Sequence, residues 1–179
     1  LRGLGEVDTG QFPDSMIGMR GMRAEGGWGI VTTEQCDFHP TGDVQPFTET
    51  RMWDDADLPY LGAMVDAVHA HGALAGIELV HNGQDSGCLY SREVPIGPEH
   101  RPVTWHQHPI QARAMSRSDL RDYRRRHRKA VPRARQAGLG MGVVSAGPTG
   151  TAPGHFPARV SSKRRDEYGG SLEARRATC

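Results

Sequence analysis

The 179-residue sequence has no apolar run approaching the roughly 20 residues that a membrane-spanning helix needs. Its first residues also lack the charged-then-apolar pattern of a secretory signal. Only three cysteines are present, Cys36, Cys88 and Cys179, and no two of them have Cys-x-x-Cys spacing. These absences argue against a disulfide scaffold and against a zinc ribbon. We therefore expect a soluble, cytoplasmic protein that keeps its thiols reduced, holds no metal and does not bind membranes.

Positive and negative side chains nearly balance over the whole chain. The 22 lysines and arginines against 21 aspartates and glutamates give a net charge of +1, so the overall charge predicts no attraction to nucleic acid. One local cluster departs from this balance. It consists of Arg124, Arg125, Arg126, Arg128, Lys129, Arg133 and Arg135. We interpret the cluster as the solvated outer face of a helix rather than a phosphate-binding element, and no nucleic-acid partner is expected.

The two ends of the chain do not look like natural ends. The chain begins at Leu1 rather than at a methionine, and it stops at Cys179 within a charged segment. A chain of this length usually forms one globular domain. We therefore expect a single domain, residues 1–179, that is truncated at both ends.

Three short stretches have the composition of buried strands. Residues 30–33 are β-branched and follow a glycine, and residues 73–80 form an apolar run whose one charged member is Glu78. Residues 141–145 predict a third strand, and Leu1 to Leu4 are interpreted as the tail of an earlier one.

Two helices separate these strands. The first is predicted to begin among the aspartates of 54–57 and to stop at Gly72, and the second is predicted to be capped by Ser116 or Ser118. Pro132 lies inside the second helix. Because proline removes a backbone hydrogen bond and clashes with the preceding turn, we expect the helix to kink or end early there.

The order strand, helix, strand, helix, strand predicts an α/β fold with a parallel sheet. Periodicity alone does not distinguish a barrel from a doubly wound sheet. Residues 81–115 are polar and predict an extended loop, which is long enough to serve a site. Ser171 is predicted to cap a last helix.

Two weaker signals point to other chemistry. The glycines at alternate positions of 138–142 resemble a dinucleotide-binding loop, but they follow a helix and precede a strand, which is the reverse of the order that loop requires. His100, His106 and His108 could suggest a metal, but no cysteine or carboxylate stands at ligand spacing, so we interpret them as part of a solvated loop.

Three segments together carry a resemblance to a known family. The first is residues 24–29 (Ala-Glu-Gly-Gly-Trp-Gly) leading into Thr-Glu-Gln at 33–35, and the second is residues 72–79 followed by His-Asn-Gly at 81–83. The third is Arg-Asp-Glu-Tyr-Gly-Gly-Ser-Leu-Glu at 165–173. In combination they are similar to the old yellow enzyme superfamily, and specifically to its amine dehydrogenase branch, which includes histamine and trimethylamine dehydrogenases.

This resemblance implies a partial (β/α)8 TIM barrel, about its first half, with FMN at the carboxyl ends of the strands. It places Gln35 and Glu78 at the cofactor, with Glu78 facing the pyrimidine edge of the flavin. It also implies a small-molecule amine as substrate, and a homodimer is one arrangement open to the full-length parent. The residues alone leave open a salt-bridged carboxylate for Glu78 and an ordinary polar strand end for Gln35.

The sequence departs from the family at three positions that matter for chemistry. The strand-end tyrosine and histidine that orient the amine fall on Ser145 and Pro148, which cannot replace them. The cysteine that attaches FMN covalently falls on Gly5, so any FMN would be held without a covalent bond. The iron–sulfur cysteines and the nucleotide domain of the family would lie beyond residue 179.

Two functions therefore stay open. The first is an incomplete FMN-dependent oxidoreductase of the amine dehydrogenase type, which passes a hydride from a small amine to the flavin. The second is a non-catalytic remnant that at most binds flavin. Either one would have open sheet edges, because three strands and the tail of a fourth cannot close a barrel.

Overall fold

The computed structural model describes residues 11–44, 50–103, 109–147 and 150–178. Its centre is a parallel sheet in the order β2-β1-β3-β7. These strands are β1 (Ile30–Asp37), β2 (Thr50–Arg51), β3 (Leu74–Val80) and β7 (Met141–Val144). The parallel α/β architecture agrees with the prediction, and each of the three predicted strands is present.

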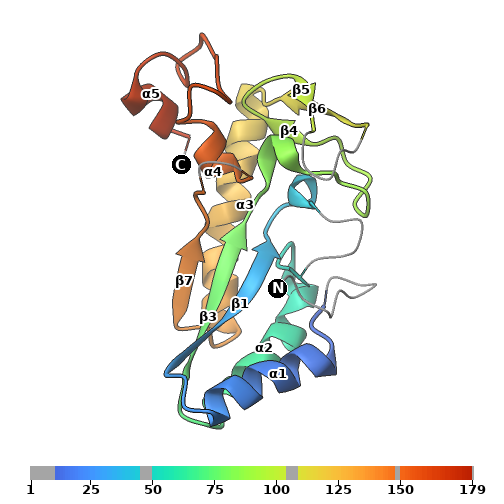
Figure 1. Ribbon diagram of the computed structural model, residues 1–179, viewed down its shortest axis with the longest axis vertical. Helices are drawn as coiled ribbons and strands as arrows, with labels where there is room; N and C mark the ends of the chain where they lie inside the picture. Colours follow the sequence, from blue (N-terminus) through green and yellow to red (C-terminus); the bar gives the residue numbers. More distant parts are fainter. Residues whose placement is uncertain (1–10, 45–49, 104–108, 148–149, 179) are drawn as a thin grey trace.

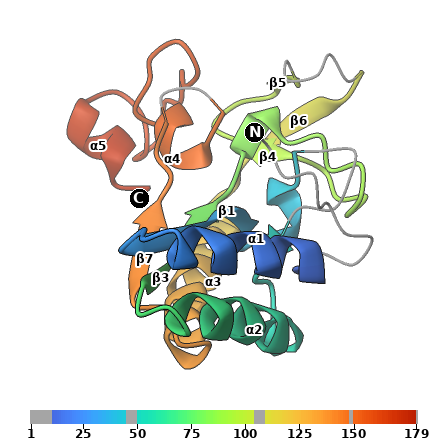
Figure 2. The ribbon, with the colours of Figure 1, turned by 60° about the horizontal axis from the view of Figure 1, so that its bottom comes forward.

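Three helices cover one face of the sheet, and they are α1 (Asp14–Glu25), α2 (Leu58–His69) and α3 (Arg117–Gln136). In Figure 1 the long strands point the same way, with α3 running behind β3 and β7 and with α1 and α2 near the lower ends of the strands. Figure 2 shows α1 and α2 side by side. Val31, Ala75, Ile77 and Leu79 point from the sheet into the core beneath these helices. Burial of such side chains stabilises the fold by roughly 1.5–3 kcal/mol each for the larger ones.

Helix α1 is not among the helices that the sequence predicts. Its residues include two glycines and a buried arginine, Arg20, and these give it low helix propensity and a poor apolar pattern. Its position depends instead on contact with α2, where Gly21 lies against Ala67. Tertiary packing therefore outweighs local propensity in this segment.

Helix α3 runs without a break from Arg117 to Gln136, so the expectation that Pro132 would end or kink it early is wrong as far as its length is concerned. Pro132 and Arg128 both lie on the exposed side of the helix. The carbonyl group that loses its hydrogen bond to proline can therefore be hydrated, which reduces the cost of the proline. Ser116 caps the helix, and its hydroxyl accepts a hydrogen bond from the backbone N–H of Asp119.

The segments that follow the strands form a layer over the carboxyl ends of the sheet, at the top of Figure 1. The loop predicted for 81–115 contains a small sheet of its own in the order β4-β6-β5. The elements of the layer are β4 (Ile96–Gly97), β5 (Arg101–Pro102), β6 (Gln111–Ala114), α4 (Ala152–His155) and α5 (Leu172–Arg176). Ser171 caps α5, as predicted.

The second face of the sheet has no helix over it within the described ranges. Ile30, Leu74 and Val143 are 50%, 39% and 41% exposed on this face or at its edge. Parallel sheets are normally covered on both faces, so this apolar face is built to be covered. None of the helices in the described residues is long and apolar enough to cross a membrane.

Candidate functional site

A β-bulge in β1 determines which side chains meet at the carboxyl end of the sheet. Thr32 pairs with Gly76 and Gln35 pairs with Glu78, so β1 uses three steps where β3 uses two. The extra residue reverses the alternation of side chains along β1. Val31 points into the helix-covered core before the bulge, and Cys36 does so after it.

The bulge therefore brings Gln35 onto the face that carries Glu78. Without it, Gln35 would point toward the helices, because side chains alternate with a period of two. The two residues are partners in the ladder, and both are half-buried. Ser145 extends the same face at the end of β7, since Val143 is the ladder partner of Glu78 and the Ser145 N–H donates to Leu79 O at 3.2 Å. Three of the positions singled out by the resemblance thus lie on, or directly after, three adjacent strands.

Thr33 sits inside the bulge and replaces a lost ladder bond. Its buried Oγ1 accepts the backbone N–H of Glu78 at 2.9 Å. Thr33→Val keeps the shape of the side chain but leaves this N–H without an acceptor, so we expect a loss of about 1–2 kcal/mol in the free energy of unfolding. Urea denaturation measures the loss, and Thr33→Ser, which keeps the hydroxyl, should lose clearly less. Equal losses for valine and serine would contradict this role of the hydroxyl.

A chain of buried side-chain hydrogen bonds lies behind this face. The Gly83 N–H donates to His81 Nδ1 at 2.8 Å, which places the His81 proton on Nε2. That nitrogen donates to Thr41 Oγ1 at 2.9 Å, and the Thr41 hydroxyl donates to His39 Nδ1 at 2.8 Å. His39 Nε2 then donates to the Asp122 carboxylate at 3.2 Å. Each proton position follows from the one before it, so the chain has a single direction.

Burial keeps these histidines neutral. Desolvation, with the nearby Arg126 charge, lowers the pKa of His39 to about 4 although Asp122 opposes the shift. Desolvation also lowers the pKa of His81 well below its ordinary value, and that of His127 in the same direction. Arg125 and Arg126 hold the pKa of the Asp122 carboxyl at about 2 despite its own partial burial.

Further contacts join the loops that follow the strands. Asn82 Nδ2 donates to Gly42 O at 2.7 Å, and His155 Nε2 lies 3.0 Å from Asp85 Oδ2 in a buried pair. The segments after β1, β3 and β7 are thereby tied to one another. The sequence predictions missed His39 and Asp122. The position of His39, two residues beyond the end of β1, is a signal that could have pointed to it, whereas Asp122 lies 83 residues away and has no comparable signal.

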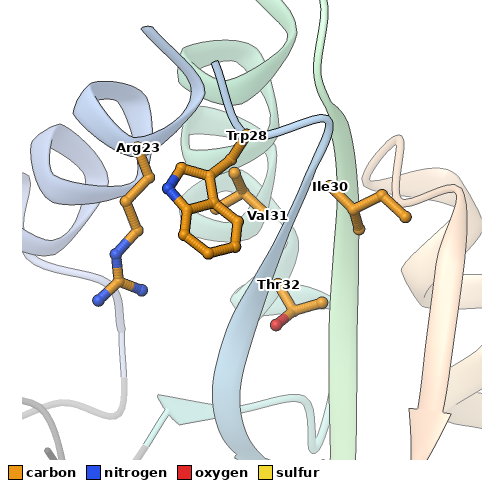
Figure 3. Close-up of a pocket in the computed structure, with 5 residues that line it drawn as sticks. All are labelled: Arg23, Trp28, Ile30, Val31 and Thr32. Atoms are coloured by element: carbon orange, nitrogen blue, oxygen red, sulfur yellow. The ribbon is translucent and has the colours of Figure 1, made fainter. Parts of the chain in front are cut away.

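A surface hollow lies at the opposite end of β1 from Gln35. Arg23, Trp28, Ile30, Val31 and Thr32 line it, and in Figure 3 the Trp28 ring lies beside the Arg23 side chain. It belongs to the amino-terminal ends of the strands, whereas the family chemistry is expected at their carboxyl ends. It is therefore not part of the candidate site.

The segment 165–173, which carries part of the resemblance, has a structural role here. Arg164, which directly precedes this segment, donates to Met115 O at 2.7 Å and to Pro98 O at 3.3 Å. Tyr168 lies under the Arg124 guanidinium, with 5.3 Å to the ring centre. Arg164 and the segment after it therefore pack against α3, Pro98 and Met115.

Several predicted positions lie outside the described residues. They are Gly5, Pro148, His106, His108 and the strand tail at 1–4. No group of three or more potential metal ligands occurs in the described ranges. Gly138 follows α3 with φ +91°, and β7 comes next. The glycines of 138–142 therefore lie between a helix and the strand after it, which is the reverse of the order in a dinucleotide-binding loop.

Comparisons with known proteins place these features in context. The model of the NADH:flavin oxidoreductase / NADH oxidase family matches residues 3–179. Dimethylamine dehydrogenase from Hyphomicrobium sp. (strain x) is 34% identical over 173 residues, which cover 91% of this chain and 23% of the relative.

Two solved structures are similar in both sequence and fold. Histamine dehydrogenase from Rhizobium sp. 4-9 superposes with a TM-score of 0.88 and is 39% identical, covering 99% of this chain and 27% of that protein. The 6-hydroxypseudooxynicotine amine oxidase from Pseudomonas geniculata N1 has a TM-score of 0.89 and 38% identity, covering 92% and 25%. The chain thus spans about a quarter of the length of these relatives. The fold is that of about the first half of a TIM barrel of the old yellow enzyme type.

Proposed function

Because the chain belongs to the NADH:flavin oxidoreductase / NADH oxidase family, we propose that residues 1–179 are the N-terminal, FMN-binding part of an oxidoreductase of the amine dehydrogenase type. When bound, FMN supplies the hydride acceptor of such a reaction, and the protein supplies position and electrostatics. The observation that carries the proposal is the bulge that brings Gln35 onto the face of Glu78.

The residues present fit the polar edge of a flavin. Glu78 offers a carboxylate that accepts a hydrogen bond from a ring N–H, and Gln35 offers both an amide donor and an amide acceptor. Both are half-buried on a face that also carries the exposed apolar side chains of Leu74 and Val143 and has no helix over it in the described residues. A planar ring with one polar edge suits such a surface, where a charge-assisted hydrogen bond is stronger than in water.

The hydrogen-bonded chain from His81 to Asp122 would support this edge from behind. It fixes the loops after β1 and β3, on which the positions of Gln35 and Glu78 depend. Its histidines stay neutral at pH 7, so they add no positive charge beside the carboxylate. These residues would therefore act as positioning residues and would not touch the flavin.

A test of the proposal is FMN affinity, measured by quenching of flavin fluorescence. Glu78→Ala removes the proposed acceptor, and loss of a hydrogen bond to a charged group should weaken binding about 10- to 100-fold. Glu25→Ala removes an exposed carboxylate at the amino-terminal end of β1 and should leave the affinity unchanged. Equal FMN affinity of the Glu78→Ala variant and the unchanged protein would exclude this assignment.

One observation favours the second candidate function, a remnant that binds flavin without turnover. Ser145 lies on the Glu78 face where the family has a tyrosine, and its hydroxyl lacks the reach and acidity of a phenol. The discriminating experiment combines FMN, a small amine and an artificial electron acceptor. Reproducible amine-dependent reduction would exclude the remnant. Amine-dependent reduction that appears in a Ser145→Tyr variant but not in the unchanged protein would support the remnant.

A further inference from the structure

Helix α3 carries a charge that the rest of the chain does not share. Its twenty residues hold nine lysines and arginines and two aspartates, a formal charge of +7. The whole chain has a charge of +1, so the remaining residues sum to −6. This asymmetry concentrates positive charge on one element at the outside of the sheet.

Four of the exposed cations of α3 form a row along the helix, which we name the α3 row. It is defined by Arg121, Arg125, Arg128 and Arg135, together with the exposed Pro132. Successive members are four, three, four and three residues apart, so all five share one side of the helix. The row extends over about 21 Å, from fourteen steps of 1.5 Å.

Most of these cations have no anion to pair with. In the described part of the chain, Arg125 pairs with Asp122 on the same helix, whereas Arg121, Arg128 and Arg135 have no ion pair. By contrast, two arginines off the row are engaged, Arg133 with Asp55 at 2.6 Å and Arg126 with Asp122 at 3.0 Å. The fold therefore leaves three of the four arginines in the row available, whereas Arg126 and Arg133 beside the row are engaged.

An exposed apolar pair lies between Arg128 and Arg135. Pro132 lies within the row, and Val131, which is 50% exposed, lies beside it. Exposed arginines next to an apolar pair are typical of protein interfaces, in which apolar contacts are bordered by a polar rim. A phosphate backbone would meet no donor at Val131 and Pro132, so the arrangement suits a protein better than a nucleic acid.

We propose that the α3 row is a docking surface for an acidic face of a partner protein, one with carboxylates at helical spacing around an apolar side chain. The carboxylates would pair with Arg121, Arg128 and Arg135, since the guanidinium fork binds carboxylates in bidentate fashion. The apolar side chain would cover Val131 and Pro132. This surface is independent of flavin binding, so its test is separate from that of the proposed function.

The test uses the whole 179-residue chain and a fluorescein-labelled helical peptide, with glutamates at i, i+3, i+7, i+11 and i+14 and one leucine between the last two of them. Fluorescence anisotropy at about 50 mM and 300 mM NaCl gives the affinity. The triple variant Arg121→Glu/Arg128→Glu/Arg135→Glu should weaken binding at least about tenfold. Binding should also weaken at the higher salt concentration, because exposed charges are screened.

Matched controls separate the row from net charge. Arg23→Glu/Arg159→Glu/Arg165→Glu reverses three exposed arginines elsewhere and should leave peptide affinity within about twofold. Val131→Ser should weaken binding about threefold, whereas Val160→Ser, at an 80% exposed valine, should not.

Three results would overturn the proposal. They are equal losses in the two triple variants, no effect of Val131→Ser, or tighter binding of a 20-base-pair DNA duplex than of the peptide at the same salt. The last result would assign the row to nucleic acid instead. Circular dichroism of each variant checks that α3 is intact.

Discussion

Gly169→Ala is expected to destabilise the protein by at least about 3 kcal/mol, near the upper end of the usual cost of overpacking. A Cβ atom at this position would overlap the backbone carbonyl of Arg164. A flexible side chain could move aside, but this obstacle is backbone. Arg164 is itself held by Met115 O and by an ion pair with Asp166, so the turn cannot shift without losing those contacts.

The matched control is Gly142→Ala in β7, where no atom lies within 4 Å of an added Cβ and φ is ordinary. Urea denaturation should show the large loss for Gly169→Ala and a change within about 0.5 kcal/mol for Gly142→Ala. Gly170→Ala should lie between them, because its φ of +72° costs an alanine about 1–2 kcal/mol. Similar midpoints for Gly169→Ala and Gly142→Ala would mean that the 164–170 turn is not packed as described.

These glycines explain why the segment 165–173 is such a specific signal in the sequence. One glycine is needed for a close approach to backbone and the next for a positive φ. Both demands come from the turn rather than from chemistry at the cofactor. A motif can therefore identify a family while its residues serve the fold.

The sequence predicted the parts of the fold that depend on local pattern. The apolar run at 73–80 and the Ser116 and Ser171 caps are present where expected. Helix α1 was missed because its stability comes from contact with α2, and such contacts leave little trace in local composition. The effect of Pro132 on helix α3 is smaller than predicted, because the carbonyl group that loses its hydrogen bond is exposed to water.

The candidate site divides in the same way. The resemblance singled out Gln35 and Glu78, but the bulge that aligns them depends on pairing between two strands and cannot be read from either strand alone. The buried link from His39 to Asp122 joins residues 83 positions apart. Links of this length require the tertiary fold before they can be seen.

Acidification is expected to destabilise the protein well above the range in which its carboxylates titrate. The folded-state pKa of His39 is about 4, whereas an exposed histidine in the unfolded chain has a pKa near 6.5. Between these values the unfolded chain binds more protons than the folded one. The stability contributed by neutral His39 is therefore fully present above pH 6.5 and is lost as the pH falls toward 4.

His81 shifts in the same direction, so both residues steepen the loss of stability over this window. Each contributes up to about 1.4 kcal/mol per pH unit, and the total for His39 is on the order of 3 kcal/mol. The stability that ionised Asp122 contributes is lost at lower pH. Because the pKa of Asp122 is about 2 in the folded protein, this contribution disappears only as the pH falls from about 3.8 to 2.

The measurement is the free energy of unfolding at several pH values between 7 and 4. His39→Gln removes one proton-binding group and should reduce the slope by up to about 1.4 kcal/mol per pH unit. His71→Gln, at an exposed histidine, should leave the slope unchanged. The slope is the informative quantity, because His39→Gln also removes the bonds to Thr41 and Asp122 and will lower stability at every pH. A slope in His39→Gln equal to that of the unchanged protein would show that His39 is not buried in its neutral form.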